Sequence, residues 1–134
     1  MNEHSFIKSI HKRLHPDVYK WKIHDTYTGG VPDAMYSGPG GVLFVEYKYI
    51  KAFPKWDTTA IKTSVSVLQL QWLERMNTAA SATLVVGVED SAVIITSKFI
   101  IWCANIHIAN IISRPISRED VTNWVRDEVL NAAR

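Results

Sequence analysis

A dense cluster of turn residues, Ser37-Gly38-Pro39-Gly40-Gly41, separates two strand-like runs in the first half of the chain. Such a cluster ends one extended segment and reverses the chain into the next. The runs on its two sides, residues 33–36 and 42–49, are therefore predicted to be the arms of a β-hairpin. Because paired arms bring facing residues together, we expect Asp33 to lie near Glu46, thirteen residues further along the chain.

Side chains on the second arm alternate between the two faces of the sheet. This alternation places Phe44, Glu46 and Lys48 on one face and Tyr47 on the other. A carboxylate and an ammonium group therefore project together. Two carboxylates from adjacent strand ends, with a lysine two residues after the second, are able to hold a hard divalent cation and orient a water molecule beside it.

The other elements are predicted from hydrophobic periodicity and from helix start and stop signals. The expected order is a helix over 3–14 that ends before Pro16, a half-buried strand over 19–24, the hairpin, an amphipathic helix over 65–79, strands over 83–88 and 92–96, and a last helix opened by Ser117 with Val121, Trp124, Val125, Val129 and Ala132 buried. Residues 98–112 fit a helix or a strand equally well. Residues 51–64 have no clear period and are predicted to form a mobile surface segment. The order indicates an α/β sandwich core.

The composition indicates one compact domain over residues 1–134, because the chain has 134 residues and 47% hydrophobic content. The single cysteine, Cys103, excludes an internal disulfide framework and a cysteine-based zinc site. The N-terminus lacks the features of a secretion signal, and the longest apolar tract, residues 99–112, is too short to span a bilayer. We therefore expect an intracellular, cytoplasmic protein with no membrane role.

The net charge of +2 is too small to indicate nucleic-acid binding by itself, but its distribution is more informative. Residues 1–67 contain nine Lys or Arg and six Asp or Glu. If Glu3, Asp33 and Glu46 face a metal, only three acids remain to offset these bases, which leaves a basic surface suited to phosphates. The alternative is that these are ordinary solvated lysines.

Pro32-Asp33 and Glu46-Tyr47-Lys48 resemble the PD and ExK motifs of the PD-(D/E)xK nuclease superfamily. Gly30-Val31-Pro32-Asp33 is also similar to the motif of its virus-type replication-repair nuclease (VRR-NUC) branch, in which a Ser-x-x-Gln helix start with a following Trp-Leu is matched by Ser66-Val67-Leu68-Gln69 and Trp72-Leu73. The small size and the order of the acidic residues resemble phage junction-resolving endonuclease I. The resemblance covers roughly residues 3–90 and implies a restriction-endonuclease-like core of helix, three-stranded meander, helix and strand, followed here by a C-terminal helix.

The resemblance implies a DNA endonuclease that uses Mg²⁺, or Mn²⁺ in its place, and it is consistent with a phage-encoded protein that acts inside a host cell. The implied metal ligands are Asp33, Glu46, the backbone carbonyl of Tyr47, and Glu3, the only glutamate before Glu46. Lys48 would position the attacking water or stabilise developing negative charge. Gln69 would orient Lys48 or the nucleophile. The candidate DNA contacts are Ser66, Lys51, Lys55, Lys62 and His11.

The small size favours a homodimer, because it leaves little material for a separate sequence-reading domain. Residues 99–112 are a candidate dimer interface, although they fit a buried core equally well. The substrate is either branched DNA, such as a Holliday junction, or a specific duplex site cut by a homing or restriction-type enzyme. The sequence does not choose between these two.

Other interpretations use the same residues. Taken singly, Glu46 and Lys48 fit a surface ion pair, and Asp33 fits a turn residue. His4, His11 and His15 have a spacing compatible with a zinc site, although no further ligand completes it. A DNA-binding module without catalysis would lack one of the three motif residues, and all three are present. Besides a DNA endonuclease and a non-catalytic binding module, the third class of function is a metal-dependent enzyme that acts on a substrate other than nucleic acid.

Overall fold

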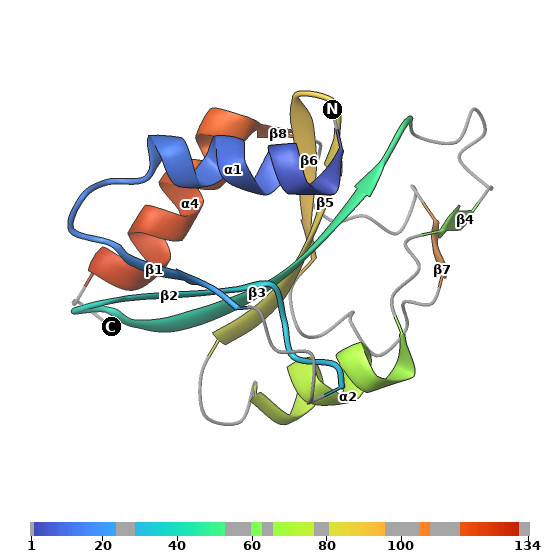
Figure 1. Cartoon of the computed structure of the whole chain (residues 1–134), viewed down its shortest axis with the longest axis horizontal. Coiled ribbons are helices and arrows are strands. Elements are labelled where there is room, and N and C mark those ends of the chain that lie inside the picture. The colour runs from blue at the N-terminus through green and yellow to red at the C-terminus, as the bar shows by residue number, and fades with distance from the viewer. Residues whose placement is uncertain are drawn as a thin grey trace.

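The protein is a mixed α/β structure in which helices cover both faces of an open, six-stranded sheet (Figure 1). The computed structural model describes residues 2–23, 29–52, 60–62, 66–76, 81–95, 105–107 and 116–131. The elements are α1 (Glu3–Arg13), β1 (Tyr19–Lys22), β2 (Ala34–Gly38), β3 (Gly41–Ile50), β4 (Ala60–Lys62), α2 (Val67–Met76), β5 (Ser81–Val88), β6 (Ser91–Ile95), β7 (Asn105–His107), β8 (Ile116–Ser117) and α4 (Arg118–Leu130). Helices α1 and α4 lie on one face of the sheet, and α2 lies on the other.

The strand order in the large sheet is β1-β2-β3-β5-β6-β8. All neighbouring strands are antiparallel except β3 and β5, which are parallel and are connected through α2. This arrangement puts β3 in the middle of the sheet, between the hairpin partner β2 and the parallel strand β5. Short strands β4 and β7 form a separate antiparallel pair.

The hairpin forms as its turn residues require. Gly38 pairs with Gly41 next to the turn, and Gly41 has a φ of 135°, which a residue with a side chain rarely adopts. The register then pairs Tyr36 with Leu43 and Ala34 with Val45. Asp33 directly precedes Ala34, the first residue of β2, and Glu46 directly follows Val45 on β3. This register therefore places Asp33 opposite Glu46.

Two hydrophobic clusters fill the spaces on the two sides of the sheet. The larger cluster lies under α1 and α4 and includes Phe6, Ile7, Ile10, Tyr36, Leu43, Val45, Tyr47, Val121, Val125 and Val129. The smaller cluster lies under α2 and includes Leu73, Leu84, Val86, Val93 and Ile95, with Phe44 and Trp72 packed against it. Strand β5 contributes to both clusters, which explains why its sequence is almost entirely apolar.

The predicted elements agree with the structure in type, and most differ from it by only one to three residues at their ends. The expected alternation of β3 is confirmed, since Tyr47 joins the cluster under α1 and Phe44 faces α2. The buried stripe of α4 is confirmed for Val121, Val125 and Val129, with Trp124 partly buried, while Ala132 lies outside the described residues.

Three predictions need correction. The strand at residues 19–24 is present, but Tyr19 and Trp21 are exposed because β1 is an edge strand and no described helix covers the face on which they lie. By its spacing Leu68 belongs to the apolar stripe of the amphipathic helix predicted over 65–79, yet it is 56% exposed. The segment 51–64 was expected to lack regular structure, whereas residues 60–62 form β4.

Some expectations fall on residues that the structure does not describe. Of residues 98–112, only 105–107 are described, and they form β7. The alternatives for the apolar tract as interface or core therefore lie outside the described residues, as do Cys103 and Lys55. Across the described ranges, each helix is too short or too polar to cross a membrane.

A pair of leucine truncations in α2 tests this packing. Leu73 is fully buried against β5 and β6, so Leu73→Ala should leave a cavity and lower the free energy of unfolding by about 2–5 kcal/mol. Leu68→Ala, in the same helix but exposed, should change it by less than about 0.5 kcal/mol. Urea denaturation of both variants measures the difference, and equal losses would contradict the orientation of α2.

Candidate active site

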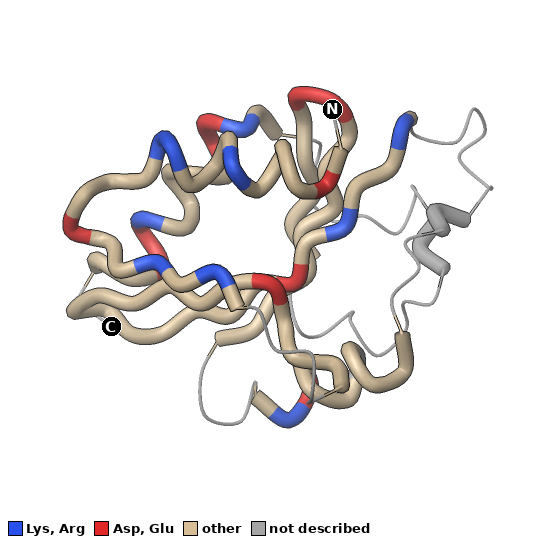
Figure 2. The backbone as a smooth tube through the Cα atoms, in the orientation of Figure 1, with Lys and Arg blue, Asp and Glu red and all other residues tan. Residues whose placement is uncertain are grey.

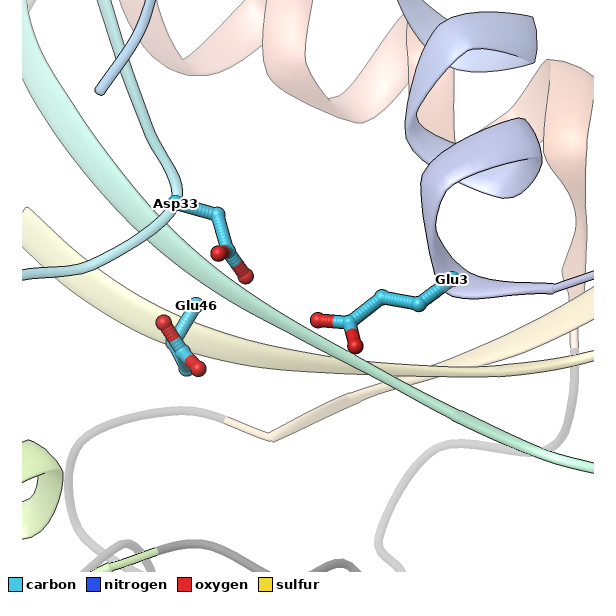
Figure 3. Close-up of side chains that lie close together, drawn as sticks. All are labelled: Glu3, Asp33 and Glu46. Atoms are coloured by element: carbon cyan, nitrogen blue, oxygen red, sulfur yellow. The ribbon is translucent and has the colours of Figure 1, made fainter. Parts of the chain in front are cut away.

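Three carboxylates from separate parts of the chain meet beside the central strand β3, next to the start of β2 (Figure 3). Glu3 is in the first turn of α1, Asp33 precedes β2, and Glu46 is in β3. One carboxylate oxygen from each lies within 4.8 Å of the other two. The hairpin therefore brings Asp33 and Glu46 together as expected, and α1 adds Glu3 to the same cluster.

The position of Glu3 is fixed by the cap of α1. The Asn2 side chain accepts a hydrogen bond of 2.8 Å from the Ser5 backbone N–H, and the Ser5 hydroxyl accepts one of 2.9 Å from the Asn2 N–H. This reciprocal pair satisfies two backbone donors that the first helical turn leaves free. The first turn is thus held in place, and with it the side chain that reaches toward Asp33.

Asp33 is positioned by backbone contacts on both sides. Its carboxylate accepts a 2.8 Å hydrogen bond from the Tyr47 backbone N–H, and its own carbonyl accepts one of 2.8 Å from Ile23 N–H. The preceding Gly30 has a φ of 83° and packs directly against the backbone of Leu68 in α2, where a Cβ would clash. This close approach joins the loop that carries Asp33 to the helix that carries Gln69.

Glu46 is 2% exposed, and only one of its two oxygens is satisfied. Oε2 accepts a 2.7 Å hydrogen bond from Gln69 Nε2 and lies 3.2 Å from the Lys48 ammonium. Oε1 has no hydrogen-bond partner. A buried polar atom without a partner is costly, and such atoms in native proteins call for a functional explanation.

Gln69 caps the first turn of α2 and also contacts Glu46. Its side-chain oxygen accepts a hydrogen bond from the Ser66 N–H at 2.9 Å, while its own N–H donates to the Ser66 hydroxyl at 3.1 Å. This Ser-x-x-Gln capping box fixes the first turn of α2 and turns the amide nitrogen toward Glu46. Gln69 therefore contacts Glu46, whereas the sequence led us to expect a contact with Lys48 or the nucleophile.

The electrostatics of the cluster follow from burial and from like charges. Burial is the main cause that raises the pKa of Glu46 to about 8, with the charge of Asp33 next and Lys48 opposing. Burial and the neighbouring Asp33 also raise the pKa of Glu3. Without a cation, Glu46 and Glu3 therefore favour binding a proton.

His11 belongs to a buried network behind the site. Its Nε2 lies 2.7 Å from the Tyr36 hydroxyl, which in turn lies 2.7 Å from the Tyr47 hydroxyl. Burial, followed by Lys20 and Lys22, lowers the pKa of His11 to about 4, so the ring is neutral near pH 7. A neutral, inward-facing ring is poorly suited to the phosphate contact expected from the sequence. In the sequence, the signal for this inward orientation was that His11 lies beside Ile7 and Ile10 on the apolar stripe of the helix.

The remaining candidate DNA contacts and the histidines lie on separate parts of the chain. Lys51 is exposed just beyond β3, Ser66 is exposed at the start of α2, and the backbone of Lys62 belongs to β4. The histidines considered for zinc do not converge: His4 contacts Lys22, and His15 contacts Asp17. Lys22 was not among the predicted site residues, although its Nζ lies 3.1 Å from His4 Nδ1 and its charge opposes the burial that raises the pKa of Glu3.

Replacing Glu46 should change how the stability of the metal-free protein depends on pH. The folded-state pKa of about 8 lies above the ordinary 4.5, so between these values the folded protein keeps a proton that the unfolded chain has released. Stability is therefore present at low pH and is lost as the pH rises from about 4.5 through about 8. Glu46→Gln should flatten this decline in urea denaturation with EDTA. The exposed Glu74→Gln is the control, and an unchanged decline in Glu46→Gln would assign the effect to other groups.

The sequence matches no protein-family model and no curated protein.

Proposed function

We propose that this protein is a Mg²⁺-dependent DNA endonuclease that hydrolyses phosphodiester bonds. The observation that carries the proposal is the convergence of Glu3, Asp33 and Glu46 within 4.8 Å, with Glu46 Oε1 buried and without a partner. Among the described residues, Lys48 forms the ion pair with this cluster, through Glu46. The excess of negative charge and the free oxygen both favour a bound cation.

The donor set fits a hard divalent ion. Mg²⁺ and Mn²⁺ prefer carboxylate, carbonyl and water oxygens. Asp33, Glu46 and Glu3 would hold the ion, together with the carbonyl of Tyr47. Residues in an antiparallel pair direct N–H and C=O to the same neighbour, so this carbonyl faces the side on which the Tyr47 N–H meets Asp33. When bound, the ion supplies Lewis acidity and lowers the pKa of a coordinated water.

The other residues of the site have separate roles in hydrolysis. Lys48 lies on the same strand face as Glu46, where its ammonium is available to orient the attacking water or to stabilise charge on the phosphate oxygens. Gln69 holds Glu46 Oε2, which leaves Oε1 for the ion. Gln69 is thus a positioning residue.

The motifs support this class of enzyme and this substrate. Pro32-Asp33, Glu46-Tyr47-Lys48 and the Ser-x-x-Gln of α2 resemble the PD-(D/E)xK superfamily and its VRR-NUC branch. The observed order of α1, the β1–β2–β3 meander, α2 and β5 supports a restriction-endonuclease-like core. Exposed Lys51 follows the catalytic strand and suits a phosphate contact. A homodimer would set two such sites against the two strands of DNA.

Removal of one carboxylate tests the proposal directly. Wild-type protein should cleave labelled DNA with Mg²⁺ or Mn²⁺ but not with EDTA, and Asp33→Asn should slow cleavage at least about a hundredfold. Mn²⁺ should raise the Tm of the wild type but not of Asp33→Asn, because an ion that binds only the folded state stabilises it. The exposed Asp17→Asn is the matched control.

The substrates should include linear duplex, a four-way junction, single-stranded DNA and RNA. Metal binding without cleavage of any of them would reject the nuclease proposal while leaving the metal site. DNA binding without cleavage under any metal would favour a non-catalytic binding module. Cleavage by Asp33→Asn at the wild-type rate would show that the site is wrongly assigned.

A second pair of variants tests Gln69. Gln69→Ala removes the donor to Glu46 Oε2 and should weaken Mn²⁺ binding and lower kcat about 10- to 100-fold, which is the usual cost of losing a partner that orients a metal ligand. Gln71→Ala, exposed in the same helix, should behave like wild type. Mn²⁺ titration separates the two, because a loss of DNA affinity without a change in Mn²⁺ affinity would make Gln69 a DNA contact.

A further inference from the structure

The edge strand β1 exposes two large aromatic side chains beside the candidate active site. Tyr19 is 61% exposed and Trp21 is 51% exposed. The sequence predicted a half-buried strand here, but among the described residues no helix packs on the face that carries these two side chains. Aromatic residues of this kind at an exposed edge are suited to contacts with flat, apolar surfaces.

The register places these aromatic side chains on the same face of the sheet as Glu46 and Lys48. Trp21 pairs with Met35, and Met35 pairs with Phe44, so all three lie in one row across β1, β2 and β3. Glu46 is the next residue of β3 on that face. From the usual strand spacing and rise, Trp21 and Glu46 are about 12 Å apart along the sheet.

A second row extends this surface away from the site. Tyr19 pairs with Ser37, which pairs with Val42, another exposed apolar residue. We define Tyr19, Trp21 and Val42 as the aromatic edge. It begins one row from the carboxylate cluster and continues outward along β1 to the turn end of the hairpin.

The same strand carries positive charge on its opposite side. In the run Tyr19-Lys20-Trp21-Lys22, aromatic and basic residues alternate. Figure 2 shows basic segments and no acidic segment along β1. Lys20 donates to the His11 carbonyl at 3.3 Å, and Lys22 lies 3.1 Å from His4 Nδ1, so both ammonium groups are held against α1, on the face of β1 opposite the aromatic side chains. Phosphates are the expected counter-charge for such a strand.

We propose that the aromatic edge binds the unpaired bases of a DNA strand whose phosphates contact Lys20 and Lys22 and whose backbone continues to the carboxylate cluster. The proposal rests on the nuclease function above and names its substrate class: branched DNA with a single-stranded segment, rather than continuous duplex. Bases inside a duplex are already stacked on each other, whereas unpaired bases are free to stack on Trp21 and Tyr19.

A second copy of this chain is a less suitable occupant. Two copies joined through β1 would place Lys20 and Lys22 of one strand against the same residues of the other, and like charges across paired strands are destabilising. Lysines on an edge strand commonly prevent such pairing. The charge on β1 therefore favours an anionic partner.

The test compares two probes in EDTA, so that binding is measured without cleavage. One probe is fluorescein-labelled oligothymidylate of about 15 nucleotides, and the other is an abasic deoxyribose-phosphate chain of equal length. The double variant Tyr19→Ser/Trp21→Ser should bind the oligothymidylate about tenfold or more weakly, with little change for the abasic chain. The salt dependence of binding should stay as in wild type, because the phosphate contacts remain.

Two further variants serve as controls. Tyr19→Phe/Trp21→Phe keeps the rings and should keep most of the affinity. Val67→Ser, which removes an exposed apolar side chain from α2, should bind both probes as wild type does. Molar mass from light scattering is measured for every variant.

The proposal is overturned if the wild type does not bind oligothymidylate, if the serine variant binds it as tightly as wild type, or if the variant loses both probes equally. A wild-type dimer that becomes a monomer in the serine variant would assign the surface to a second copy. Failure of the nuclease proposal is separate. Base-dependent binding without Mg²⁺-dependent cleavage would reject the nuclease alone, and cleavage without base-dependent binding would reject the aromatic edge alone.

Discussion

The buried carboxylate of Glu46 is the group on which the arrangement of the site depends. One oxygen is held by Gln69 and Lys48, and the other has no hydrogen-bond partner. The carboxylate as a whole lies close to those of Asp33 and Glu3. Like charges this close repel each other strongly where water is excluded. Such a cluster persists only if rigid elements hold each member, because the side chains would otherwise move apart into solvent.

Each member of the cluster has its own support. Glu46 lies in the central strand β3, with strands paired on both sides. Asp33 is fixed by the Tyr47 N–H, and Tyr47 is itself fixed through its hydroxyl contact with Tyr36 and then His11. These groups satisfy each other inside the larger core, which makes the network rigid. The electrostatic repulsion within the acidic cluster is thus offset by packing in the larger hydrophobic cluster under α1 and α4.

Much of the fold could be predicted from the sequence because its signals are local. The glycine-rich turn predicted the hairpin, the apolar run of β5 predicted a buried strand, and Ser117 predicted the start of α4. Asp33 and Glu46 could be paired in advance because a hairpin fixes its register at the turn. Glu3 was expected from family resemblance alone, because nothing local in α1 tells which side chain will face Asp33 and Glu46.

The predictions that failed concerned burial and side-chain orientation, which depend on residues far away in the sequence. Alternation in Tyr19-Lys20-Trp21-Lys22 predicted a strand but not its burial, because burial is set by whether a helix covers that edge. The inward orientation of His11 required Tyr36 from another element. The sequence by itself determined the elements, the hairpin and the identity of the acidic residues, since each follows from short-range periodicity and turn chemistry. Only the tertiary structure decided that Gln69 holds Glu46, that one carboxylate oxygen is free, and that β1 is exposed, because these follow from contacts between separate elements.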